Sequence, residues 1–357
     1  MALSAIPPAW ATPPVGKRQL LPLSRGVNIP DWAIASTGTE PSADVLFMLR
    51  RLGFTYVRLP LDSDDWIGET ADLPAARRAV AGALDALAQA GLAAMIDFHP
   101  SESLRGWAEA APLPASRAIF SAWQRLSSQL AAYAPAAVFP ELLNEPPFAR
   151  GHWLDLRDEL ISLVRTTCPE HTIVWGADRY QSIGETIGVQ PPDDANTIAA
   201  VHYYTPMSFT HQCADWDQSG LARIRNLPFP ASAETPEVRL LANSLRDLGD
   251  DPALALLEED IGQPWTIERI GSDMQALAGW AEANKIPVLL NEFGVLDSCV
   301  DGKSRNTWIR AVRASAEAAG LGWAYWELDH GFGFMNDRES AQDIDMSLLA
   351  ALLGGEN

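Results

Sequence analysis

The stretch VAGALDALAQAGLAAMIDFH, residues 80–99, contains the unit from which the fold can be inferred. Its apolar positions fall on one face of a helix, namely Val80, Ala83, Leu84 and Leu87. Gly91 follows, and glycine most readily takes the left-handed conformation that ends a helix. The apolar run LAAMIDF then comes at once, as expected of a strand buried on both faces. The stretch predicts an amphipathic helix that returns the chain to a parallel sheet.

The same unit recurs along the chain. Gly53 and Gly320 end amphipathic helices before FTYVRLP and LGWAYWE, and Asn284 takes the corresponding place before KIPVLLNEF. Adding the runs LSRGVNI, VFPELLN, TIVWGAD and NTIAAVHYY gives eight candidate strands, which begin near residues 23, 54, 93, 138, 172, 196, 286 and 321. We therefore predict an α/β fold, a single-domain (β/α)8 barrel. A doubly wound open sheet is the main rival, but no G-x-G-x-x-G or Walker-type loop follows any of these runs.

Two segments depart from this rhythm. Residues 1–20 are predicted to be a Pro-rich tail, which leaves 21–357 for the barrel. Residues from about 205 to 263 carry several prolines, Trp216 and an acidic stretch, and are predicted to form an enlarged loop after strand six. Loops at that end of a barrel surround its functional site, so this loop either shapes a cleft or elaborates the surface.

Composition excludes several classes of protein. A formal charge of −20 would repel nucleic acid and anionic membranes, and the chain has no apolar run of about 20 residues that could span a bilayer. The three cysteines are widely spaced, with no C-x-x-C pair, so we expect neither a disulfide framework nor a zinc site. We expect a monomer that needs no cofactor or metal and acts on an uncharged substrate. We also expect the protein to be secreted or periplasmic, although its first residues form no clear signal peptide.

Polar residues end most of the predicted strands, where a barrel carries its chemistry. They are Arg58, His99, Asn144, Glu145, His202, Tyr204, Glu292, Trp326 and Glu327. Glu145 and Glu292 follow strands four and seven and are expected to face each other across the barrel mouth. Cleavage of a glycosidic bond needs such a pair, one carboxyl to protonate the leaving oxygen and one carboxylate to attack the anomeric carbon.

Two motifs carry a specific resemblance. LLNEPP at 142–147 and LLNEFG at 289–294 resemble the acid/base and nucleophile motifs of glycoside hydrolase family five, the cellulase-type barrels. RGVNI at 25–29, VRLP at 57–60, DFH at 97–99, VHYY at 201–204 and the strand of Trp326 are similar to other signatures of that family, in the same order. The resemblance covers about residues 23–335. It implies a retaining mechanism with carboxyl groups about 5–5.5 Å apart.

The resemblance implies a role for each matched residue. Glu145 is the acid/base, and we expect nearby Glu292 and partial desolvation to raise its pKa. Glu292 is the nucleophile, kept ionised by Arg58 and Tyr204. Asn144 is expected to bind the 2-hydroxyl of the sugar, and Trp326 is expected to stack on its ring. His99 and His202 either bind the sugar or orient the glutamates. Candidates for outer subsites are Trp32, Trp107, Phe148 and Asp329, with His330 beside Asp329.

Other interpretations remain open at this point. A metal-dependent hydrolase could use Asp97, His99, Glu145 and His202, although the sequence has neither an H-x-H after strand one nor H-E-x-x-H. A non-catalytic carbohydrate-binding barrel is an alternative of another class. Among substrates we favour β-1,4-glucan, with β-mannan, β-1,3-glucan and exo-acting glucosidase activity as alternatives.

Overall fold

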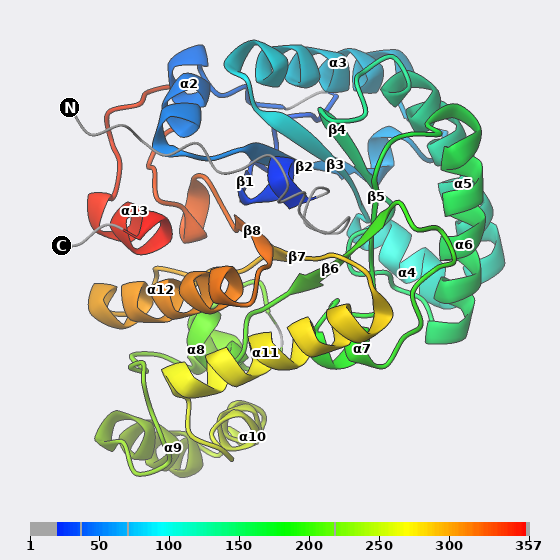
Figure 1. Ribbon diagram of the computed structural model, residues 1–357. Helices are drawn as coiled ribbons and strands as arrows, with labels where there is room; N and C mark the ends of the chain where they lie inside the picture. Colours follow the sequence, from blue (N-terminus) through cyan, green and yellow to red (C-terminus); the bar gives the residue numbers. More distant parts are fainter. Residues whose placement is uncertain (1–19, 36–37, 70, 218, 355–357) are drawn as a thin grey trace.

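Eight parallel strands close into one barrel in the computed structural model, which describes residues 20–354 apart from 36–37, 70 and 218 (Figure 1). Each strand pairs with its neighbours in sequence, and β8 closes the barrel against β1. The strands are β1 Arg25–Asn28, β2 Tyr56–Asp62, β3 Ala93–His99, β4 Val138–Glu141, β5 Ile173–Gly176, β6 Thr197–His202, β7 Val288–Glu292 and β8 Gly322–Tyr325. Each strand overlaps its predicted run, and only β2 and β3 extend past it, to Asp62 and His99, so the (β/α)8 prediction is confirmed.

Helices surround the barrel and connect its strands (Figure 1). They are α2 Ala43–Leu52, α3 Leu73–Ala90, α4 Glu102–Ala110, α5 Pro112–Leu130, α6 Arg150–Thr167, α7 Ile183–Ile187, α8 Met207–Thr210, α9 Pro236–Leu248, α10 Asp251–Asp260, α11 Ile267–Asn284, α12 Gly302–Ala318 and α13 Met346–Leu353. Short 3-10 turns are η1 Leu21–Leu23, η2 Ser63–Asp65, η3 Leu221–Arg223 and η4 His330–Phe332. None of the helices in the described ranges is both long and apolar enough to cross a membrane.

Helix ends follow the expected glycine rule with one exception. Gly53 and Gly91 take left-handed conformations, with φ of 97° and 73°, directly after α2 and α3. Asn284 was expected to do the same before β7, and this expectation is wrong. Asn284 is the last residue of α11, and Lys285 takes the left-handed conformation with φ 55°. Asparagine remains helical there because its side-chain amide donates to the backbone oxygen of Trp280.

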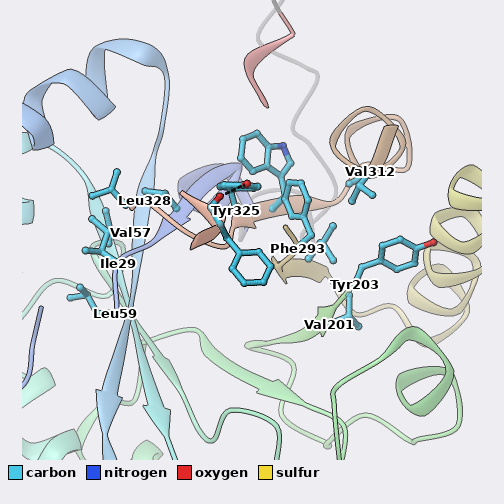
Figure 2. Packing of buried hydrophobic residues seen from close by; sticks show 14 of the residues in the cluster. Ile29, Val57, Leu59, Val201, Tyr203, Phe293, Val312, Tyr325 and Leu328 are labelled. Carbon is cyan, nitrogen blue, oxygen red and sulfur yellow. Dashed lines mark hydrogen bonds between the residues drawn. The ribbon is translucent and has the colours of Figure 1, made fainter. Parts of the chain in front are cut away.

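The strands separate two layers of apolar side chains. Their outward residues pack under the helices, and Figure 2 shows Val57, Val201 and Phe293 in this layer with Val312 of α12. A second cluster fills the barrel and includes Tyr56 and Met95. Because side chains alternate along a strand, the residue two positions after each inner apolar residue also faces inward, one level nearer the strand ends. The chain places polar residues on that level.

The segment between β6 and α11 contains α8, η3, α9 and α10, which agrees with the enlarged loop expected at about 205–263. Helices α9 and α10 pack against each other at the edge of the molecule (Figure 1). The beginning of the segment instead reaches the barrel mouth, where Met207, His211 and Trp216 line a hollow. The segment therefore combines cleft-forming and purely peripheral parts.

A disulfide bond corrects the prediction made from cysteine spacing. Cys213, in the segment after β6, is bonded to Cys299, which follows β7, with Cα atoms 6.0 Å apart. Cys168 is free and buried. The two cysteines are 86 residues apart, and this spacing gives no sign of a bond, because the loops that carry them come together only in the closed barrel. The tail predicted for residues 1–20 lies outside the described residues except for Leu20.

Candidate active site

Arg58 is the centre of a polar layer that lies on the apolar filling of the barrel. Tyr56, two residues earlier on β2, points into that filling, and Gly26 leaves the space for its ring, since a Cβ atom at position 26 would lie 2.3 Å from it. Arg58 is fully buried. Because side chains alternate along β2, Arg58 points into the barrel as Tyr56 does, but nearer the C-terminal ends of the strands.

The guanidinium group of Arg58 is bound on every side. Nε and Nη2 donate to the two carboxylate oxygens of Glu141 at 2.6 and 3.0 Å. Nη1 donates to Glu292 Oε1 at 2.6 Å, and Nη2 lies 3.0 Å from a carboxylate oxygen of Asp97. Nη2 also donates to Asn144 Oδ1 at 2.8 Å. These carboxylates outweigh the effect of burial and raise the pKa of Arg58, so it remains charged.

Glu292 accepts a hydrogen bond at each of its carboxylate oxygens. Besides the bond from Arg58, the Tyr204 hydroxyl donates to Oε2 at 3.1 Å. Burial and the charge of Glu292 raise the pKa of Tyr204 well above its ordinary value, so the phenol keeps the proton that it donates. The register between β6 and β7 shifts at this point, His202 being paired with Glu292 after Val201 with Leu290. Such a bulge redirects side chains, and here Asn291 reaches Glu141 in the barrel while Glu292 reaches the cleft.

Glu145 is held in an uncommon backbone conformation, with φ 41°. Its backbone N–H donates to Gln181 Oε1 at 2.5 Å, and its Oε1 is 2.9 Å from His202 Nδ1. Arg105 Nη2 lies 3.6 Å from the other carboxylate oxygen. A non-glycine residue in this region of φ is unusual and is often found at functional sites, where neighbouring contacts maintain it.

The protonation expected at Glu145 is wrong for the free protein. Burial favours the neutral acid, but the hydrogen bond and charge of His202, with the charge of Arg105, outweigh it and lower the pKa of Glu145. Burial also opposes charge on His202, yet Glu292 and Glu145 raise the pKa of this histidine. Its Nε2 is 3.5 Å from Glu292 Oε1. In the free protein the two shifts favour an ionised Glu145 beside a protonated His202.

His99 and Asn144 form a fixed pair beside Glu292. His99 Nδ1 is 2.8 Å from Asp97 Oδ2, and Nε2 is 3.3 Å from Asn144 Nδ2. Because Asn144 Oδ1 accepts from Arg58, its amide nitrogen must face His99 and the cleft. The ring of Trp326 lies 6.3 Å from that of His99 and lines the same hollow.

Two hollows meet at Glu145. The first, of about 460 Å³, is lined by Glu145, Glu292, Tyr204 and Trp326, among others. The second, of about 960 Å³, lies beyond Glu145 against α4 and the start of α6. Tyr180 and Trp216, 69% and 61% exposed, line both hollows. Together the hollows form one open cleft that passes over the glutamates.

Of the four candidates for outer subsites, only one lines the cleft. Phe148 lines the second hollow, although it is only 5% exposed. Trp32 is equally buried and packs in the core, and Trp107 is 38% exposed on α4 but is not among the residues that line either hollow. Asp329 is buried in an ion pair with Arg338 and borders a separate hollow outside the cleft. The structure thus brings Phe148 to the cleft and leaves the other three away from it.

Several residues in and around the site were missed by sequence reasoning. Glu141 ends β4 inside the barrel and holds Arg58, and an alternating inward pattern along VFPE could have indicated it. Gln181, Tyr180 and Trp216 come from loops whose path the sequence does not reveal. Glu327 was recognised at the end of strand eight but given no role, and it lies buried in the first hollow.

The residues that could hold a metal ion match the competing metal-dependent scheme only at Glu145 and His202. Donor atoms of Glu145, His202 and Glu292 lie within 4.8 Å of one another. Asp97, which that scheme requires, is instead bound to Arg58 and His99. One carboxylate oxygen of Glu145 thus lies within 4.8 Å of one of Glu292, an approach compatible with retaining glycosidases, whose carboxyl groups are about 5–5.5 Å apart.

Comparison with known proteins gives a consistent result. The sequence model of the family described as "Cellulase (glycosyl hydrolase family 5)" matches residues 22–331. "Endoglucanase 3" of Fibrobacter succinogenes is 24% identical over 362 residues, which cover 94% of this chain and 54% of that protein. "Endoglucanase C" of Acetivibrio thermocellus is 27% identical over 189 residues, 52% of each chain. The chain spans about half the length of these curated relatives.

Solved structures share the fold at lower identity. An endoglucanase structure has a TM-score of 0.78 at 23% identity, covering 95% of this chain and 99% of that one. Thermotoga maritima Cel5A, described in complexes with cellobiose and with mannotriose, has TM-scores of 0.76 and 0.73 at 22% identity, covering 95% and 94% of this chain and 99% of its own.

Proposed function

The chain belongs to the cellulase family, glycosyl hydrolase family 5, and from that premise we propose that it is an endo-β-1,4-glucanase with Glu145 as acid/base and Glu292 as nucleophile. It is a glycoside hydrolase, and retaining double displacement is general to its family. The observation that carries the residue assignment is the approach of the two carboxyl groups to within 4.8 Å in one cleft.

Glu292 begins the reaction by attacking the anomeric carbon. Its Oε1 is held by Arg58 and its Oε2 by Tyr204, so both oxygens are oriented for the attack. The bond from the anomeric carbon to the leaving oxygen breaks as the bond to Glu292 forms, giving a covalent glycosyl-enzyme.

The proton for the leaving oxygen comes from the pair of His202 and Glu145. His202 Nδ1 is 2.9 Å from Glu145 Oε1 and Nε2 is 3.5 Å from Glu292 Oε1, so charge on both glutamates keeps the imidazole protonated. When attack neutralises Glu292, His202 loses part of that stabilisation and releases its proton to Glu145, which protonates the leaving sugar. In the second step Glu145 takes a proton from water, and the hydroxide oxygen displaces Glu292 from the sugar.

The first hollow binds the sugar whose bond is cleaved. The free N–H of Asn144 is available for the 2-hydroxyl, an interaction that strengthens in the transition state. Trp326 offers a ring face to the axial C–H groups of a pyranose. His99 orients Asn144 through Nε2, which makes it a positioning residue rather than a direct participant.

An open cleft favours attack within a chain. The second hollow continues past Glu145, on the side where the leaving part of the substrate must lie, and neither end of the cleft needs to accept a chain terminus. β-Mannan is the second candidate, because Cel5A of Thermotoga maritima is described with both cellobiose and mannotriose. β-1,3-Glucan is the third.

A product profile over cello-oligosaccharides, mannan, xyloglucan and laminarin tests the substrate assignment. An endo-β-1,4-glucanase is expected to release mixed oligosaccharides from the cellulose series faster than from the others. Turnover of mannan alone, or release of only glucose from chain ends, would reject it. Cleavage of aryl cellobiosides provides a control for activity that is independent of chain length.

We also propose a secreted or periplasmic monomer. The bond between Cys213 and Cys299 forms in oxidising compartments and is rare in the cytosol. Cell fractionation tests the location, and gel filtration with light scattering tests the monomer. Residues 21–357 are proposed to form the catalytic domain, with the segment at about 205–263 as a part of it.

A further inference from the structure

Glu327 is a third carboxyl group in the first hollow. It directly follows Trp326 at the end of β8, is 6% exposed, and lines the hollow together with Glu292. Over the described part of the chain, no hydrogen bond or ion pair reaches its carboxyl oxygens. The carboxyl group thus faces the hollow without being used by the fold, which leaves it available to a ligand.

The charges that face Glu327 are mostly negative. Asp329 follows it on the same loop, Asp31 comes from the loop after β1, and Glu292 ends β7. His330 lies beside this group, with its Nε2 against the carboxylates of Asp31 and Asp329, at 3.9 and 3.7 Å. The phenols of Tyr204 and Tyr325 are also near, and the charge of Glu327 helps to raise the pKa of each. Burial, with the charges of Asp329 and Asp31, raises the pKa of Glu327 to about 8.

Arg338 is the nearby cation, and its donors are already used. Nε and Nη2 donate to both carboxylate oxygens of Asp329 at 2.6 and 2.5 Å. Nη1 donates to the backbone oxygens of Pro30 and Thr39 at 2.8 and 3.2 Å. Arg338 therefore weakens the negative field around Glu327 without supplying it with a hydrogen bond.

A neutral carboxylic acid can donate one hydrogen bond and accept others, whereas a carboxylate can only accept. We propose that Glu327 binds the non-reducing part of the β-glucan chain, its protonated carboxyl group donating to a sugar hydroxyl next to Trp326. This inference rests on the proposed function. Glu327 is a substrate-binding residue that fixes the orientation of the sugar, and its donor is lost when the group ionises.

Binding of a cello-oligosaccharide with sulfur in place of the glycosidic oxygen measures this role without turnover. Calorimetry at pH 6 and pH 9 compares the wild type with Glu327→Gln and Glu327→Ala. The control is Glu339→Gln, which removes an exposed carboxylate from the separate hollow that Asp329 borders outside the cleft. Thermal unfolding at pH 6 verifies that each variant is folded.

The wild type and the control are expected to lose about tenfold in affinity from pH 6 to pH 9, since at one unit above its pKa about a tenth of Glu327 remains protonated. Glu327→Gln keeps a donor that cannot ionise and should retain its affinity at pH 9. Glu327→Ala should bind about tenfold more weakly at pH 6, with little further loss. Titration of His202 affects all four proteins alike, so it cancels in the comparison.

The proposal is overturned if Glu327→Gln loses affinity as the wild type does, or if Glu327→Ala binds normally at pH 6. Failure of the proposed function looks different. In that case the wild type itself binds no thio-linked cello-oligosaccharide at either pH.

Discussion

Replacing Arg58 with lysine is expected to damage stability and catalysis together, although the positive charge is kept. The guanidinium group makes five hydrogen bonds to buried acceptors, whereas an ammonium group has three N–H donors. At least two of these hydrogen bonds are lost. Each such loss costs about 1–3 kcal/mol, so we expect the free energy of unfolding to fall by about 2–6 kcal/mol.

The effect on catalysis comes from Glu292. A charge-assisted hydrogen bond to its Oε1 is worth about 1.5–3 kcal/mol, which corresponds to a fall in kcat/KM of roughly 10- to 150-fold. Urea unfolding followed by tryptophan fluorescence and hydrolysis of an aryl cellobioside measure the two quantities. Arg51→Lys, an exposed position on α2, is the matched control and should change neither. Wild-type stability with kcat/KM within threefold of normal for Arg58→Lys would refute the assigned role of the polar layer.

Four further outcomes are expected. Glu292→Gln should abolish turnover with the fold intact, whereas Glu145→Gln should slow substrates with poor leaving groups far more than aryl glycosides; equal losses on both substrates would contradict the acid/base assignment. Replacing Cys213 and Cys299 with serine should lower the free energy of unfolding by about 2–4 kcal/mol. As a check, a reductant should lower the free energy of unfolding of the wild type but not that of the double variant. A carboxyl group whose pKa is higher in the folded than in the unfolded chain stabilises the fold fully below the unfolded pKa, and this contribution is lost as the pH rises to the folded pKa. The free energy of unfolding of Glu327→Gln, relative to that of the wild type, should therefore increase by about 2–4 kcal/mol from pH 5 to pH 9. An equal difference between the two proteins at both pH values would disprove the raised pKa. Activity should persist in excess chelator, and its loss, restored by a divalent metal, would favour a metal-dependent reaction.

Most of the fold could be predicted because its signals are local. Each strand is an apolar run, and residues such as Gly53 and Gly91 end the preceding helices with conformations that few other residues adopt. The strands then lie around the barrel in the same order as they occur in the sequence. The disulfide bond could not be predicted in this way, since Cys213 and Cys299 belong to different loops that the closed barrel brings together.

The candidate site was predictable where it depends on strand ends. Arg58, Glu145 and Glu292 were inferred from their positions after apolar runs, and the structure brings them into one network. Protonation was not predictable. The pKa of Glu145 depends on His202 and Arg105, and only the folded chain shows that these cations outweigh burial and the charge of a second glutamate.

The central claim is that Glu292 forms a covalent bond to the sugar while Glu145 supplies and removes the proton. Mass spectrometry of the protein treated with a 2-deoxy-2-fluoro-cellobiosyl fluoride tests it most directly, because fluorine slows release of the glycosyl-enzyme. We expect one added 2-fluoro-cellobiosyl unit, located by peptide mapping on Glu292, and no adduct with Glu292→Gln. An adduct on another residue, or a product of inverted anomeric configuration from an enzyme that is never labelled, would contradict it.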